Sequence, residues 1–507
     1  MLSSRRTFLA SAVAFAAVPT RGSPPLAVAD GELTELTLDL AQRRMSSGAW
    51  SAEVLTRAYL TRIEKVNLQG PMLRALLEVN TDAERSARAL DDERRAGRVR
   101  GPLHGIPIVL KDNIDTNDGM KTTAGSVVLV DAPTPQDAAI VQQLRKAGAV
   151  LLGKANMSEW ANARSHFSVS GWSARGGLSR NPYALDRSTC GSSSGSATSV
   201  AAQLTLLAVG TETLGSIQCP AAMTNTVGIK PSIGLVSQAG IIPVSSSFDT
   251  AGPFARSVKD AATLLAILAK KPADAYTSSL SPDALRGKRI GVFRDQWGEH
   301  PVARVVLEEC VAALRDRGAD VVEAPIDDGA VYLGAAFTVM QYELKATLAA
   351  YLKRRGGSLR TLSDVIAANE RRAGEELALF GQELFVAANA RGGLSEDSYR
   401  LSVRSLELAA HEIAQDFAKH RIDAFFSPTT GIPHLVDPVR GDAGGDRVGT
   451  AMATLAKGPV VTVPGGFVKG LPYGVNFEGL HGQDARIIAL ASAFEQATHH
   501  RRPPPPL

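Results

Sequence analysis

Two loops rich in serine and glycine stand close together in the sequence and are the first candidates for chemistry. They span residues 188–196 and 210–216, and the apolar stretch Ala197–Val209 separates them. A flexible linker would lack this apolar insert, and a phosphate loop would need a following lysine or a G-x-G-x-x-G pattern. Glycine lets the backbone approach a ligand closely. The serines are therefore candidate nucleophiles, although a serine before the predicted helix start at Ile217–Ala222 also fits a helix cap.

A serine nucleophile needs a base that activates its hydroxyl and later protonates the leaving amine. The nine histidines are scattered, and His104 and His166 stand in separate segments. Lys111 directly follows the apolar run Ile106–Leu110, which is typical of a buried strand. Neutralising a lysine at pH 7 costs about 4.6 kcal/mol, and desolvation can supply a shift of that size. Without further information, Lys111 fits a surface loop better than a base.

Short motifs distributed along the chain form a long and specific signature. They lie at residues 105–107, 110–113, 190–197, 210–221, 228–231, 249–253, 428–429 and 463–466. With weaker stretches they cover nearly all of residues 35–500, and together they resemble the amidase signature family. Residues 156–162, 171–173 and 180–183 resemble, within that family, the bacterial peptide amidases.

The resemblance implies a Ser–Ser–Lys catalytic set. Ser216 matches the nucleophile, and Lys111 matches the base. Ser192 matches the bridging serine, which the family holds after a cis peptide bond, here the bond from Gly191. In the implied reaction, neutral Lys111 takes a proton from Ser192 while Ser192 takes one from Ser216. Ser216 then forms an acyl-enzyme that water hydrolyses.

The resemblance also implies how the reaction is supported. The backbone N–H groups of Thr213, Leu214, Gly215 and Ser216 would hold the oxyanion, and a helix start behind them would add a favourable dipole. Ser193 resembles a supporting hydroxyl that hydrogen-bonds the base, with a small loop residue as the alternative. No cofactor is needed for this chemistry.

Three positions near these motifs invite other interpretations. Leu214 stands where the peptide amidases carry an acidic residue, which puts substrate preference in doubt and favours an apolar acyl group. Asp249 is expected to hold a loop rather than to act in catalysis. Cys190 and Cys219 are expected to be small packed residues, with a disulfide as the less favoured alternative.

The elements that must position these residues follow a strand–helix–strand pattern. Short apolar runs predict strands at 106–110, 150–152, 288–293, 320–322, 460–463 and 473–477. Apolar periodicity predicts helices at 138–147, 302–317 and 485–496, a helix capped by Ser51, and a mostly helical region from about 330 to 420. The pattern predicts an α/β fold with one main core. The resemblance adds a single large domain, residues 30–500, in which helices cover both faces of a mixed, twisted central sheet.

Composition and charge exclude several classes of protein. The 507 residues carry 55 Lys and Arg against 51 Asp and Glu, and a net charge of +4 is too small for a nucleic-acid binder of this length. Three cysteines exclude a disulfide scaffold and a four-thiolate zinc site. No His, Cys and Asp cluster has metal-ligand spacing. The expected partner is a small-molecule or peptide amide; the oligomeric state is not readable.

The two ends of the sequence have their own signals. Arg5 and Arg6 precede the apolar run Phe8–Val18, which is too short to span a bilayer, and Ala27–Ala29 matches a cleavage pattern. Residues 1–29 therefore resemble a twin-arginine export signal, which predicts a periplasmic or secreted protein without stable membrane insertion. Residues 501–507 are expected to form an extended proline-rich tail with no packed role.

The leading hypothesis is a secreted amidase that acts on peptide C-terminal amides or related small amides and releases ammonia or an amine. The same catalytic set would also suit aryl or fatty acylamides, or esters. The tRNA-dependent amidotransferases share the fold, but an export signal argues against that class. A non-catalytic periplasmic ligand binder is a further alternative, and the complete set of Lys111, Ser192 and Ser216 argues against it. Residues 330–420 match the family least and are expected to shape the pocket.

Overall fold

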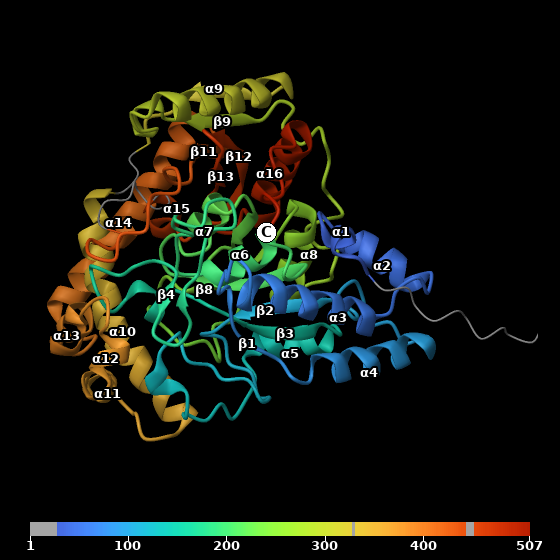
Figure 1. Ribbon diagram of the computed structural model, residues 1–507. Helices are drawn as coiled ribbons and strands as arrows, with labels where there is room; N and C mark the ends of the chain where they lie inside the picture. The colour runs from blue at the N-terminus through green and yellow to red at the C-terminus, as the bar shows by residue number, and fades with distance from the viewer. Residues whose placement is uncertain (1–27, 327–329, 443–450) are drawn as a thin grey trace, which may run out of the picture.

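The computed structural model describes residues 28–326, 330–442 and 451–507. Its centre is a mixed sheet of 11 strands in the order β1-β3-β2-β6-β8-β7-β12-β13-β11-β9-β10. In Figure 1 the labels run from β9 near the top of the view to β1 near the bottom. The strands are β1 (Leu76–Val79), β2 (Pro107–Lys111), β3 (Val150–Ala155), β6 (Leu207–Glu212), β7 (Val227–Lys230), β8 (Thr250–Ala255), β9 (Arg289–Val292), β10 (Asp320–Glu323), β11 (Ala424–Pro428), β12 (Val460–Val468) and β13 (Leu471–Glu478).

Parallel pairing occurs at two places in this sheet. Strands β3, β2 and β6 are mutually parallel neighbours, as are β11, β9 and β10, while the strands between these groups pair antiparallel. All the strands predicted from apolar runs are present. A separate hairpin joins β4 (Trp172–Ser173) to β5 (Gly177–Leu178).

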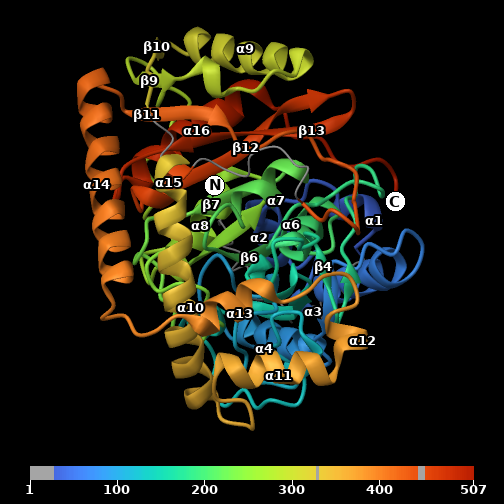
Figure 2. The ribbon, with the colours of Figure 1, turned by 90° about the vertical axis from the view of Figure 1, so that its left-hand side faces the viewer.

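Helices flank the sheet and form a separate layer beside it. The α-helices are α1 (Asp30–Leu33), α2 (Leu38–Ser46), α3 (Ala52–Arg62), α4 (Ala83–Arg95), α5 (Ala139–Lys146), α6 (Ser194–Ala201), α7 (Gln218–Met223), α8 (Val258–Leu268), α9 (Pro301–Asp316), α10 (Leu333–Arg355), α11 (Leu362–Arg371), α12 (Ala373–Glu376), α13 (Glu383–Ala390), α14 (Asp397–His420), α15 (Ala451–Leu455) and α16 (Asp484–Thr498). Helices α10–α14 confirm the predicted helical region, and α10 and α14 lie side by side (Figure 2).

The core follows from this arrangement. One large apolar cluster covers the sheet and the helices that pack on it, among them α8 on β7 and β8, and α16 on β12. Two smaller clusters fix the helical layer, one between α10, α14 and α15 and one under α10, α11 and α13. The α/β prediction with one main core is confirmed. Within the described ranges, no helix combines the length and apolarity needed to cross a membrane.

The apolar stretch between the two serine loops is not one helix. It divides into α6, which ends at Ala201, and β6, which begins at Leu207. Gln203 takes a left-handed conformation, with φ of +60°, where the chain turns between them. Both elements are buried on all sides, so the stretch is apolar throughout and its periodicity does not distinguish helix from strand.

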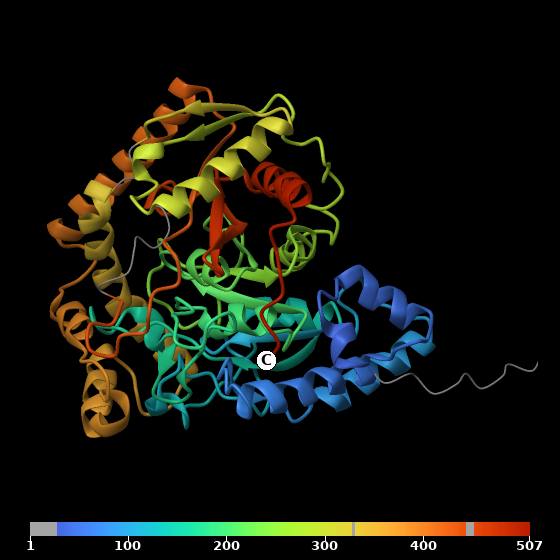
Figure 3. The same ribbon diagram turned by 45° about the horizontal axis from the view of Figure 1, so that its top comes forward.

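The C-terminal tail is extended as predicted, but it does pack, contrary to expectation. It runs down from α16 in Figure 3. The Arg501 guanidinium forms an ion pair with Glu35 at 2.9 Å and donates a hydrogen bond to the Asn225 carbonyl. Arg502 stacks over Phe467. The two arginines therefore fasten the tail to the domain. At the other end, residues 1–27 of the predicted export signal lie outside the described part of the chain.

Candidate active site

The candidate base lies at the end of a buried strand, as the apolar run predicted. Strands β2 and β6 are parallel neighbours, with Leu110 opposite Val209, so their carboxyl ends meet at the same edge of the sheet. This places Lys111, which is fully buried, beside Thr211. The Lys111 ammonium nitrogen lies 3.0 Å from the Thr211 carbonyl oxygen and 2.9 Å from its hydroxyl.

The first serine loop brings two hydroxyls to the same nitrogen. Lys111 Nζ lies 2.8 Å from Ser192 Oγ and 3.0 Å from Ser193 Oγ. The Gly191–Ser192 peptide bond is cis, as the resemblance implies. The structure therefore brings Lys111, Ser192 and Ser193 together, and Ser193 makes the supporting contact expected of it.

Ser193 also fastens this loop to β6. Its hydroxyl donates to the Thr211 carbonyl at 2.9 Å and accepts from the Thr211 N–H at 3.2 Å. Such a close approach needs glycine on the strand, because a Cβ at Gly210 would lie 2.6 Å from Ser193 Oγ. The close packing of loop and strand fixes the hydroxyls around the lysine.

Burial shifts the titration of the lysine in the direction that a base requires. Removal of the ammonium from water lowers the pKa of Lys111 to about 7, while the nearby carboxylates of Asp249 and Glu212 act in the opposite direction. The Asp249 carboxyl is itself buried, and desolvation raises its pKa to about 6. A substantial fraction of Lys111 is therefore neutral near pH 7, as a proton acceptor must be.

The candidate nucleophile stands in a tight turn closed by a carboxylate. Ser216 follows Gly215, whose φ of +76° favours glycine. Glu212, the last residue of β6, accepts hydrogen bonds from the N–H groups of Ile217 at 2.6 Å and Gln218 at 3.1 Å. The turn is thus held at both ends.

This carboxylate changes one expectation about the oxyanion site. Helix α7 has only six residues, and Glu212 already occupies its N-terminal N–H groups, so no free helix start stands behind the turn. In contrast, the N–H groups of Thr213, Leu214, Gly215 and Ser216 donate to no acceptor within the described part of the chain. These four donors remain available for an oxyanion.

A polar network explains why the signature motifs come from both ends of the chain. The Gln218 side chain donates to Glu212 and accepts from the Asn476 amide at 3.0 Å. Asn476 in turn accepts from the hydroxyls of Thr429 at 2.7 Å and Thr462 at 2.8 Å. Thr429, from the motif at residues 428–429, therefore supports through Asn476 the turn that carries Ser216.

Asp249 holds loops, as the sequence predicts. Its carboxylate accepts from the Thr213 hydroxyl at 2.6 Å and from the N–H groups of Val244 at 2.8 Å and Ser245 at 2.9 Å. It therefore ties the start of the nucleophile turn to the loop that precedes β8. The contact with Thr213 also brings a carboxyl group near the candidate active site.

Ser216 opens onto a cavity of about 230 Å³. The serine is 7% exposed, whereas Lys111 and Ser192 are completely buried. Side chains from the helical layer form one wall, which confirms that residues 330–420 shape the pocket. Leu214 also lines the cavity and packs against the second apolar cluster, which contains residues of α10 and α14. The remaining lining residues are Ala161, Asn162, Ala163, Ser170, Cys190, Gly191, Thr213, Val244, Phe337, Met340, Gln341, Leu344, Leu384 and Asp442.

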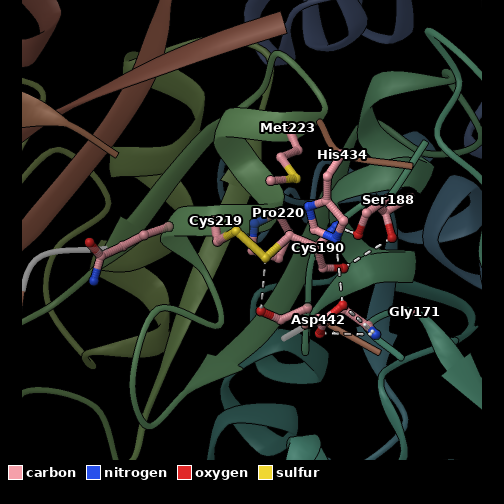
Figure 4. Close-up of a disulfide and its surroundings, with 12 residues drawn as sticks. Gly171, Ser188, Cys190, Cys219, Pro220, Met223, His434 and Asp442 are labelled. Atoms are coloured by element: carbon pink, nitrogen blue, oxygen red, sulfur yellow. Dashed lines mark hydrogen bonds and ion pairs between the residues drawn. A yellow bond between two sulfur atoms is a disulfide. The ribbon is translucent and has the colours of Figure 1, made fainter. Parts of the chain in front are cut away.

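The two cysteines near the serine loops are bonded, which corrects the expectation that they are merely packed. Cys190 and Cys219 form a disulfide that joins the loop before Ser192 to the helix after Ser216 (Figure 4). The bond lies in a small apolar cluster with Met223. A separation of 29 residues in the sequence does not reveal this contact, which depends on how α6 and β6 fold back.

Thr211 and Glu212 are site residues whose roles the sequence pattern does not reveal. Both belong to a quoted motif, but a threonine and a glutamate after an apolar strand also fit an exposed strand end. The apolar run Leu204–Val209 leading into them is the signal that could have placed them with Lys111. Among the described residues, no cluster of three or more His, Cys, Asp or Glu is arranged to hold a metal ion.

Comparisons with known proteins identify the family of this chain. A family model described as Amidase matches residues 54–488. A probable amidase of Arabidopsis thaliana is 36% identical over 508 residues, covering 96% of this chain and 93% of the relative.

Two solved structures resemble this one closely. The native peptide amidase from Stenotrophomonas maltophilia superposes with a TM-score of 0.86 and 44% sequence identity, covering 93% of this chain and 98% of that one. An amidase family protein from Bacillus anthracis superposes with a TM-score of 0.83 and 35% identity, covering 94% and 93%. Since the family model and the relatives cover almost the whole domain, the chain belongs to the amidase signature family and is an amide-hydrolysing enzyme.

Proposed function

We propose that this enzyme hydrolyses the C-terminal amide of short apolar peptides, or a closely related small carboxamide, through an acyl-enzyme on Ser216. The observation that carries the proposal is the contact between buried Lys111 and the Ser192 hydroxyl at 2.8 Å, together with a cavity that is lined by Ser216 and by Gly191, the residue before Ser192. Similarity to a peptide amidase over 93% of the chain supports the substrate class.

The hydrogen bonds around the lysine support a direction for the proton transfer. The Ser193 hydroxyl gives its proton to the Thr211 carbonyl, so toward Lys111 it can only accept. The Thr211 carbonyl likewise only accepts. With the two N–H bonds of a neutral lysine directed to these acceptors, its lone pair faces the hydroxyls of Ser192 at 2.8 Å and Thr211 at 2.9 Å. We assign the transferred proton to Ser192, which the family resemblance makes the bridging serine.

Ser192 replaces the proton it loses by taking one from Ser216, which attacks the amide carbon. The N–H groups of residues 213–216 stabilise the oxyanion that forms. As the tetrahedral intermediate collapses, the C–N bond breaks, and the relay returns a proton to the departing ammonia. Water attacks the acyl-enzyme with the same groups acting as base.

The size and apolar lining of the cavity determine which acyl portion of a substrate can bind. Leu214, Phe337 and Met340 surround it with apolar surface, and a volume of about 230 Å³ is small for a peptide site. Leu214 replaces the acidic residue that the peptide amidases carry, so an apolar acyl portion is favoured over a charged one. A short peptide amide with apolar side chains fits both the small volume and the apolar lining of the cavity.

We further propose export by the twin-arginine route to the periplasm or beyond. The paired Arg5 and Arg6 with the following apolar run support this route. The Cys190–Cys219 disulfide supports it too, because disulfides persist in oxidising compartments. Cell fractionation of the full chain should find the protein in the periplasm or medium, and substitution of both arginines by lysine should retain it in the cytoplasm. Equal export of that variant would overturn the route.

Ammonia release from a dipeptide amide tests the function. The purified enzyme should release ammonia, and Ser216→Ala and Lys111→Met should lose nearly all of this activity. Ser194→Ala is the matched control, because this serine lies in the same loop and its buried hydroxyl has no partner among the described residues. Its activity should stay within about threefold of wild type, because the substitution breaks no hydrogen bond. Preferential hydrolysis of anilides or esters would contradict the substrate class, and equal activity in all variants would contradict the catalytic set.

A further inference from the structure

One wall of the cavity differs in character from the others. Asn162, Ser170 and Asp442 lie together on it, whereas the helical layer and Leu214 present mainly apolar groups. Among the described residues that line the cavity, Asp442 alone is ionisable. A carboxylate in such surroundings is a marked departure from an otherwise apolar acyl pocket, because charge in an apolar site needs a partner.

The contacts of Asp442 leave it with acceptor capacity. Its carboxylate accepts the Ser170 N–H, with oxygen distances of 3.1 and 3.2 Å, and its side chain remains 32% exposed. The His434 imidazole lies 3.6 Å away, on the side of the disulfide (Figure 4). A carboxylate offers about four acceptor sites, so the Ser170 N–H uses only a part of them.

A second acceptor on the same wall lacks a donor. The Asn162 amide nitrogen donates to the Ser170 hydroxyl at 3.0 Å, which leaves the amide oxygen as the free end. That oxygen is buried and has no hydrogen-bond partner among the described residues. A buried acceptor without a donor costs free energy until a ligand supplies one. The wall thus combines a negative charge with an unused acceptor.

We propose that Asp442 and Asn162 bind a primary ammonium group of the substrate while the apolar wall holds its side chains. An ammonium is compact and carries three N–H donors, which suits the small cavity. With the proposed function, on which this inference rests, the substrate class becomes short apolar peptide amides with a free N-terminal ammonium. Asp442 is then a specificity-determining residue and takes no part in the proton relay.

Matched peptide amides test the inference at pH 7. Di-, tri- and tetrapeptide amides of apolar residues are each assayed with a free and with an acetylated N-terminus. Three lengths are used so that one of them spans the distance from Ser216 to the Asp442 carboxylate. A charge-assisted hydrogen bond supports a preference of about tenfold to hundredfold in kcat/KM for the free ammonium at the best length. Asp442→Asn should abolish this preference, whereas Asp397→Asn should keep it, because Asp397 is 91% exposed on α14.

Two further measurements keep the test decisive. Asp442→Lys should reverse the preference and favour peptides with a succinylated N-terminus. In the wild-type enzyme, hexylammonium should inhibit at least tenfold more strongly than hexanol, a comparison that needs no variant. Equal kcat/KM for free and acetylated peptides at every length, or equal inhibition by the two hexyl compounds, would overturn the inference. Absence of ammonia release from all peptides would instead overturn the proposed function.

Discussion

The catalytic edge of the sheet and the helical wall that faces it are built on opposite principles. At the sheet edge, Lys111, Ser192 and Thr211 are fully or almost fully buried and connected by hydrogen bonds. On the wall, Phe337 is 53% exposed and contributes apolar surface. A proton relay needs fixed distances and low water content, whereas a binding wall needs only shape and apolar area. We therefore expect substitutions at the edge to abolish the reaction and substitutions on the wall to alter selectivity.

The largest effect should come from the nucleophile. Ser216→Ala should lower kcat by about 10⁴-fold or more, because no other group in the relay can form the acyl-enzyme. Ammonia release under single-turnover conditions measures it. Loss of less than about tenfold would show that the edge does not hold the reacting group.

The disulfide fixes the two serine loops relative to one another. Closing a loop of 29 residues stabilises the folded protein by about 3 to 4 kcal/mol in the chain-entropy description. The Cys190→Ser, Cys219→Ser double variant should lose about that much in urea unfolding. The denatured wild type should show one reactive thiol, from Cys310, without reductant and three with it. Three thiols without reductant would show that the bond does not form.

The pH profile separates the buried edge from the wall. With the pKa of Lys111 near 7, kcat/KM should fall below that pH by about tenfold per unit, because protonated lysine cannot act as a base. Asp249 raises the pKa of Lys111, so Asp249→Asn should move this limb to lower pH. Phe337→Ala should leave the midpoint unchanged. A midpoint below 5 in the wild type would exclude Lys111 as the titrating base.

The carboxylate that closes the nucleophile turn should have an intermediate effect. Glu212→Gln keeps one oxygen for the N–H groups of Ile217 and Gln218, but it removes the negative charge and replaces the oxygen that accepts from the Gln218 side chain by an NH2 group that cannot accept, so the turn loosens. Loss of charged hydrogen bonds predicts a fall in kcat of about 10- to 100-fold with little change in KM. A pure KM effect would place Glu212 in binding instead.

The smallest effect should come from the wall. Phe337→Ala removes apolar contact area and should lower kcat/KM for peptides with large apolar side chains by about three- to tenfold. Small substrates should lose less. Leu408→Ala is the matched control, because this residue is 50% exposed on α14 and does not line the cavity. An equal loss in both variants would assign the effect to stability.

Sequence reasoning succeeds where local pattern and chemistry coincide. An apolar run ending in Lys111 defines a buried strand end, and the motif places Ser192 and Ser216 in loops. The apolar pattern does not distinguish Lys111 from Lys154 and Lys230, which are also fully buried on strands. Lys154 donates to Thr122 and Lys230 to the Gly458 carbonyl, and neither lines the cavity. Only the three-dimensional partners separate a base from a structural lysine.

Other features depend on contacts that the sequence does not encode locally. The disulfide, the Glu212 contacts and the packed Arg501 each join segments brought together by chain reversal. The helical layer was predicted as helical, but its orientation over Ser216 follows from the packing of α10 against α13 and α14. Apolar periodicities of 2 and 3.6 residues specify strands and helices, but they do not specify which elements pack against one another.

The acyl-enzyme on Ser216 is the central claim, and peptide mapping of a trapped intermediate tests it most directly. The enzyme is mixed with an apolar acyl amide, quenched in acid within one turnover and digested. Mass spectrometry should find the acyl group on Ser216 in the wild type and on no residue in Ser216→Ala. An acyl group on Ser192, or one that persists in Ser216→Ala, would contradict the account.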